Sequence, residues 1–127
     1  MAERNHLTDT LALAVDNDRK ELDAVLALTS STLDLTSRTV KSLEEGLGVA
    51  ADPEAVRVQH RVAVAGALKE RYHDKFLRLC QPDDRVFTVK VAGMLLNEVV
   101  GEIDWFDLAA HYISKVAEYR DDIPAGF

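Results

Sequence analysis

The sequence predicts an all-α protein: a single domain built as an antiparallel bundle of about four helices. Three observations predict it. Apolar residues recur at steps of three and four along most of the chain. Residues that start and stop helices separate the periodic segments. No two segments alternate as paired strands would. The length of 127 residues fits one domain, residues 1–127, in which residues 1–7 and 121–127 are expected to be flexible.

The longest periodic segment covers residues 8–47 and predicts a helix that packs along its whole length. From Leu22 onward, the inward positions alternate steps of four and three, which is the heptad pattern of coiled coils. We interpret this row as an assembly seam, carried by Leu22, Leu26, Leu33, Val40 and Leu43.

The start of this segment leaves two alternatives open. Asp16, Asn17 and Asp18 compete with helical hydrogen bonds through their side chains, and Asp18 with Glu21 is close to a capping box. The segment is therefore either one helix of about 40 residues or a short helix followed by a long one. Glycines near residue 47 would end it.

The second helix has the clearest start signal, Asp52 followed by Pro53, and should extend to about Leu79. Its predicted inward face, again spaced by three and four, is Ala55, Val58, Val62, Ala65, Lys69, Tyr72, Phe76 and Leu79.

The third segment, residues 85–102, begins with an alternation typical of a strand. We interpret it as a helix because no other segment offers a partner strand. Its expected inward positions are Val89, Gly93, Leu96 and Val100.

A fourth helix should begin at Asp104. Its predicted inward face is Trp105, Ala109, Tyr112, Val116 and Tyr119. The first two helices are much longer than the last two. In a monomeric bundle, part of the apolar surface of the long helices would therefore stay uncovered. This mismatch favours a homo-oligomer, most simply a two-fold dimer.

Composition bounds the function. The net charge of −7 argues against a dedicated nucleic-acid-binding protein, whose domain is normally basic. The single cysteine, Cys80, excludes an intramolecular disulfide and suits a reducing cytoplasm. No stretch approaches eighteen apolar residues, so we expect a cytoplasmic protein without a membrane span.

The second helix carries a basic stripe inside this acidic chain. The stripe consists of Arg57, Arg61, Arg71, Lys75 and Arg78. The favoured interpretation is that it flanks a helix interface and pairs with the acidic helices. The alternatives are contact with a phosphate backbone, which would weaken steeply with salt, or contact with a partner protein.

Catalytic and metal-binding patterns are incomplete. Glu70 and His73 have the Glu-x-x-His spacing of a di-iron half-site, and Asp107 with His111 could add ligands, but the full ligand set is missing. We therefore expect neither a metal nor a cofactor. Cys80 lies two helical turns from His73, too far for a nucleophile–base pair, so we do not expect an enzyme.

An aromatic pair, Trp105 and Phe106, is the best candidate for a protein contact, with one ring anchoring the core and the other partly exposed. The sequence as a whole favours a non-catalytic, self-associating helical adaptor, assembly or regulatory protein. The alternative is a nucleic-acid-associated accessory protein that uses the basic stripe.

Overall fold

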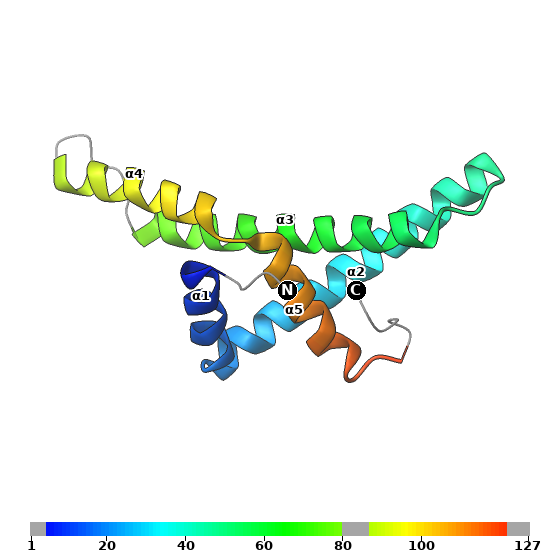
Figure 1. Ribbon diagram of the computed structural model, residues 1–127, viewed down its shortest axis with the longest axis horizontal. Coiled ribbons are helices and arrows are strands. Elements are labelled where there is room, and N and C mark those ends of the chain that lie inside the picture. The colour runs from blue at the N-terminus through cyan, green and yellow to red at the C-terminus, as the bar shows by residue number, and fades with distance from the viewer. Residues whose placement is uncertain (1–4, 80–86, 122–127) are drawn as a thin grey trace.

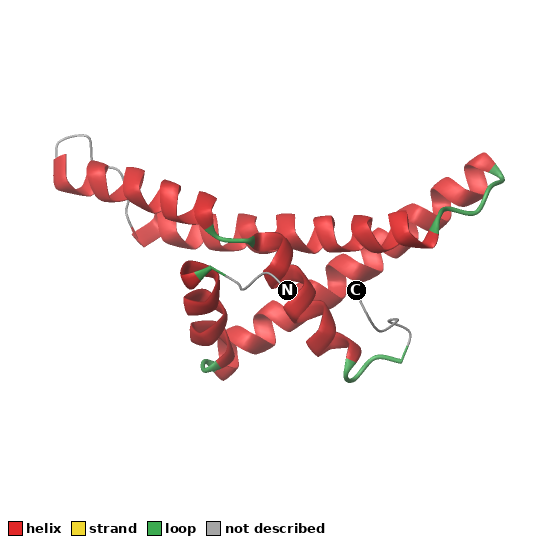
Figure 2. Ribbon diagram, in the orientation of Figure 1, coloured by secondary structure: helices red, strands yellow, loops and turns green. Residues whose placement is uncertain are grey.

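The computed structural model describes residues 5–79 and 87–121, and all regular structure in them is helical (Figures 1 and 2). Five helices are described: α1 (His6–Asp16), α2 (Arg19–Leu47), α3 (Pro53–Leu79), α4 (Phe87–Glu102) and α5 (Trp105–Ala117). The predicted all-α class is confirmed. The segment whose start alternates like a strand is helical from Phe87 onward, and residues 85–86 lie outside the described part.

The first periodic segment is two helices, which settles the alternative that the sequence left open. Asp18 is extended, with φ −110° and ψ 102°, and its carboxylate accepts the Glu21 backbone N–H at 3.1 Å. The short polar side chain replaces a missing helical hydrogen bond and restarts the chain as α2. Asn5 caps α1 in the same way, accepting the Thr8 N–H at 2.8 Å, so α1 begins inside the expected flexible lead-in.

The helices form a spread arrangement around a central body (Figure 1). The long helices α2 and α3 cross, α5 packs across both, and α1 packs on α2 and α5. The α3 helix also contacts α4. At one end of the molecule, α4 lies alongside the C-terminal part of α3. At the other end, the C-terminal part of α2 and the N-terminal part of α3 project together. We call residues 35–62 the α2–α3 arm.

The core lies where α5 crosses the two long helices. On α5 it contains Leu108, Ala109, Tyr112, Ile113 and Val116, all essentially inaccessible to solvent. Val25 of α2 and the α3 pair Val64 and Leu68 are buried against them. The predicted α5 face is confirmed except at Tyr119, which is exposed beyond the helix end.

The predicted inward face of α3 is wrong at Ala55, Val58, Val62 and Lys69, which are all exposed. Val58 and Val62 are 47 % and 55 % exposed, while the buried row is His60, Val64, Leu68 and Tyr72, spaced by four. A row spaced by four packs where helices cross at an angle, whereas a row spaced by three and four suits helices that run alongside each other. Because α2 and α3 cross, the row spaced by four is the one covered.

Candidate protein-interaction surface

The predicted assembly seam is divided between the core and the surface. Leu33 is in the core, and Leu22 and Leu26 are partly buried against it. Val40 is partly buried and borders a groove on the arm, and Leu43 is 60 % exposed. Packing within the single chain therefore covers the proximal part of the seam, and only its distal end reaches the surface.

The α2–α3 arm carries a concentration of exposed apolar side chains. Eleven large hydrophobic residues are exposed in the described part of the chain, and six of them belong to the arm. These six are Leu35, Leu43, Leu47, Val49, Val58 and Val62. Exposed apolar side chains gathered on a projecting hairpin are a common feature of surfaces that bind another protein.

Two shallow grooves follow the arm. One, of about 300 Å³, lies between α2 and α3, and Val40, Leu43, Leu47 and Val56 are among its lining residues. The other, of about 450 Å³, lies on the outer face of α3 and is lined by Asp52, Glu54, Ala55, Val58, Gln59 and Val62.

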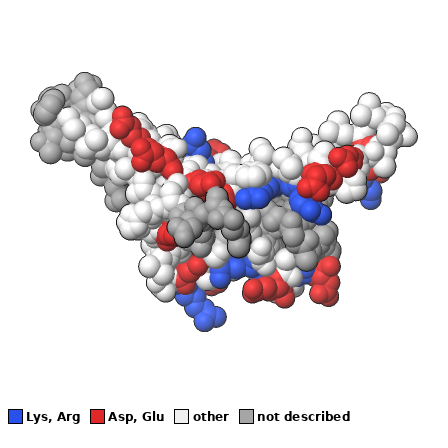
Figure 3. Space-filling model, in the orientation of Figure 1, with Lys and Arg blue, Asp and Glu red and all other residues white. Residues whose placement is uncertain are grey.

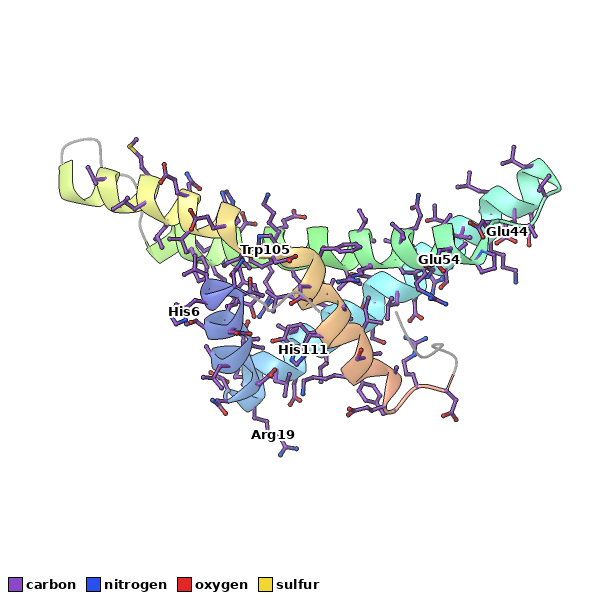
Figure 4. All side chains as sticks on the ribbon, viewed as in Figure 1. His6, Arg19, Glu44, Glu54, Trp105 and His111 are labelled. Atoms are coloured by element: carbon purple, nitrogen blue, oxygen red, sulfur yellow. The ribbon has the colours of Figure 1, made fainter. Side chains whose placement is uncertain are left out.

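The charged side chains that line these grooves are carboxylates. Glu44 borders the first groove, and Asp52 and Glu54 border the second. Figure 4 places Glu44 and Glu54 on the arm, and Figure 3 shows acidic side chains beside its uncharged surface. The arm therefore presents apolar grooves with acidic edges.

Most cations of the basic stripe lie close to carboxylates of other helices. Arg71 donates two hydrogen bonds to the Glu21 carboxylate, at 3.0 and 3.1 Å, and the Lys75 ammonium lies 3.6 Å from the same group. Tyr72 adds a third hydrogen bond to Glu21, at 2.8 Å. Glu21, which the sequence indicated only as a capping residue, thus joins α2 to α3.

The electrostatics of this cluster favour the ionised carboxylate. Burial opposes charge on Glu21, but the hydrogen bonds from Tyr72 and Arg71 and the charges of Arg71 and Lys75 outweigh it, so the pKa of Glu21 is lowered. Burial and the neighbouring Glu21 carboxylate raise the pKa of the Tyr72 hydroxyl, which therefore stays protonated and donates.

The N-terminal part of the stripe is also engaged. The Arg61 Nε donates to the Phe106 carbonyl oxygen at 2.7 Å, and its guanidinium lies 3.8 Å from the centroid of the Phe106 ring and 4.0 Å from the Asp107 carboxylate. Arg57 pairs with Glu54 of its own helix at 3.5 Å. Arg78 is exposed and borders a third groove, of about 340 Å³, together with the acidic Glu70 and Asp74 and other residues of α2 and α3.

The aromatic pair has one buried and one exposed member. Trp105 is 7 % exposed, its indole N–H donates to the Val100 carbonyl at 2.9 Å, and its ring stacks on Tyr72 at 6.2 Å between centroids. Phe106 is 39 % exposed beneath the Arg61 guanidinium. The structure thus places Trp105 in the core and leaves part of Phe106 accessible on α5, in contact with Arg61 at the base of the arm.

The candidate metal ligands point to different partners. His73 contacts Asn97 at 3.0 Å, Glu70 is exposed, and His111 pairs with Asp16 at 3.0 Å. Within residues 5–79 and 87–121, no three potential ligand side chains form a group that could hold a metal ion. Cys80 lies outside the described residues.

His60 is buried between the two long helices and is 5 % exposed. Its ring contacts the Ser37 hydroxyl at 3.0 Å and the Val56 carbonyl at 2.7 Å. The polar partners from both helices explain why an imidazole can be buried there.

Among the described helices, none is both long enough and apolar enough to cross a membrane. Comparison of the chain with models of protein families, with curated proteins and with solved structures finds no match.

Proposed function

We propose that this chain is a non-catalytic helical adaptor or assembly protein of the cytoplasm, which self-associates and acts through protein–protein contacts of the α2–α3 arm. The observation that carries the proposal is the clustering on this arm of six of the eleven exposed large hydrophobic side chains in the described part of the chain.

The shape of the molecule supports this assignment. The helices α1 and α5 pack on the central body. Arg61 at the base of the arm contacts α5, and the end of the arm projects away from both helices (Figure 1). Exposing leucine and valine to water costs roughly 25 cal/mol for each Å² of apolar surface. A second protein surface that covered these residues would recover that free energy, so the arm is suited to binding.

The alternative, a nucleic-acid-associated accessory protein, has weaker support. Arg71 and Lys75 share Glu21, and Arg61 lies near Asp107. Contact with phosphates would have to compete with these intramolecular pairs. The ion pairs agree better with the structural role for the stripe.

The proposal predicts that charges on the arm abolish self-association. The test variant is Leu43→Asp/Val62→Asp, which places one carboxylate in each groove. The matched control is Leu13→Asp/Met94→Asp, because Leu13 and Met94 are equally exposed, at 64 % and 62 %, but lie on α1 and α4.

Native mass by light scattering, at low and high salt, is the measurement. We expect a dimer or larger species for the wild type and the control, and a monomer with unchanged helical circular dichroism for the test variant. A wild-type protein that is monomeric at both salts would overturn the proposal.

A further inference from the structure

We propose that the outer face of α3 pairs with the same face of a second copy, antiparallel and about a two-fold axis. The face consists of Ala55, Val58, Val62 and Gly66. This inference rests on the proposed self-association and deepens it, because it names the surface and the occupant.

The four residues lie on one side of α3, since steps of three and four return to the same side of a helix. All four are exposed, and a Cβ added at Gly66 would meet nothing within 4 Å. They lie opposite the row that contains Val64 and Leu68, which faces the core.

The sizes of these side chains fit an antiparallel pair. When the two copies of α3 oppose each other about a centre near residue 60, Val58 of one copy faces Val62 of the other, and Ala55 faces Gly66. Each contact then occurs twice, as a two-fold interface requires. The large side chains fill the centre, and the small residues at both ends allow the helices to approach closely.

Charge complementarity selects both the occupant and its direction. Glu54, with a side chain 71 % exposed and paired with Arg57 of its own helix, stands at the N-terminal end of the face. Lys69 stands at the other end, exposed and without an ion pair to a described residue. Antiparallel pairing about this centre sets each Lys69 opposite residue 51 of the second copy, less than one helical turn from Glu54 and within reach of the long lysine side chain. Parallel pairing would set Lys69 beside Lys69 and Glu54 beside Glu54, which repel.

The groove over the face supplies the complementary shape. It is lined by Ala55, Val58 and Val62 and edged by Glu54. The second copy offers it two valines and a lysine, so a single helix face supplies both the apolar surface and the positive charge that the groove lacks.

Disulfide trapping tests the geometry. In a Cys80→Ser background, Val58→Cys and Val62→Cys chains are prepared separately and then mixed under mild oxidation. A disulfide forms only where Cα atoms approach within about 7 Å. We expect efficient cross-linking in the mixture, between a 58 chain and a 62 chain, and little in either variant alone. Self-cross-linking of either variant at the level of the mixture, or no cross-linking at all, would overturn the inference.

Charge reversal tests the orientation independently. Lys69→Glu should raise the dimer dissociation constant about three- to tenfold, and Lys69→Glu/Glu54→Lys should restore it, because the pair is rebuilt with the charges exchanged. Sedimentation equilibrium measures both. A double variant weaker than the single one would contradict antiparallel pairing.

The two proposals fail in different ways. A wild-type protein that is dimeric but gives no 58–62 cross-link overturns the α3 pairing and leaves the arm as the assembly surface. A monomeric wild type overturns both.

Discussion

One carboxylate, Glu21, connects the two long helices at the residue scale. It receives hydrogen bonds from Arg71 and Tyr72, and Lys75 lies nearby. Its side chain is only 22 % exposed, so the ion pair is less screened than a fully exposed one. The cluster should contribute to the stability of the fold, because removing the Glu21 carboxylate leaves three polar groups without their shared partner.

The lowered pKa of Glu21 predicts a dependence of stability on pH. A carboxyl group whose pKa is depressed on folding stabilises the fold above its unfolded value, near 4.5, and this contribution is lost as the pH falls through the folded pKa. Glu21→Gln should therefore lower the free energy of unfolding by on the order of 1–2 kcal/mol at pH 7. The difference in this free energy between the variant and the wild type should shrink towards pH 3.

Urea unfolding between pH 3 and 7 checks this expectation. Asp23→Asn is the control, since Asp23 is exposed on the same turn of α2 and should give a curve parallel to the wild type. A constant difference between Glu21→Gln and wild type across this pH range would show that the carboxylate charge is not what stabilises the cluster.

At the scale of the elements, local chemistry places the helix ends. Asp18 and Asp104 each accept a backbone N–H three residues later, at 3.1 and 3.0 Å, and begin α2 and α5. Gly48 ends α2 in the left-handed region, with φ +69°, and its N–H returns to the Glu44 carbonyl at 2.8 Å. These interactions span only a few residues, so the sequence signals for them are strong.

Two neighbouring glycines of α2 should respond in opposite directions to alanine. Gly48→Ala forces a Cβ into the left-handed region and should lower the free energy of unfolding by about 1 kcal/mol. Gly46→Ala lies within the helix, where nothing is within 4 Å of the added Cβ, and should raise it by about 0.5–1 kcal/mol. Denaturant midpoints of both variants measure the difference. Equal shifts of the same sign would show that the end of α2 is not held in this conformation.

At the scale of the whole molecule, α5 unites the structure. It packs on α1, α2 and α3, and its inward residues are among the most deeply buried in the described part. The arm and α4 project from this centre, with several large apolar side chains facing solvent. Stability should therefore be highest at the crossing and lower towards both ends.

Hydrogen exchange should reveal this gradient. Amides of α5 and of the stretches of α2 and α3 beneath it should exchange only on global unfolding, whereas residues 40–50 and α4 exchange earlier through local opening. Ile113→Val, which removes one buried methylene, should lower the free energy of unfolding by about 0.5–1.5 kcal/mol. It should therefore accelerate hydrogen exchange throughout the centre by the same factor. Mass spectrometry of peptides follows each region, and uniform exchange along the chain would contradict the gradient.

The sequence by itself determined the all-α class and the positions of most helix ends, because periodicity, caps and glycine stops act over a few residues. It left open whether the chain breaks at Asp16, Asn17 and Asp18, since these residues are compatible with either outcome. The hydrogen bond from the Glu21 N–H to Asp18 decides the question in the structure.

Only the tertiary structure decided which face of α3 is buried and which partners the cations take. The row with Val58 and Val62 is apolar, and so is the row with Val64 and Leu68. Hydrophobic periodicity alone therefore does not distinguish the buried face from the exposed one. The crossing of α2 and α3 covers the second row, and it brings Glu21 within reach of Arg71, fifty residues away along the chain. Contacts of such separation depend on how helices cross, which no local pattern in the sequence specifies.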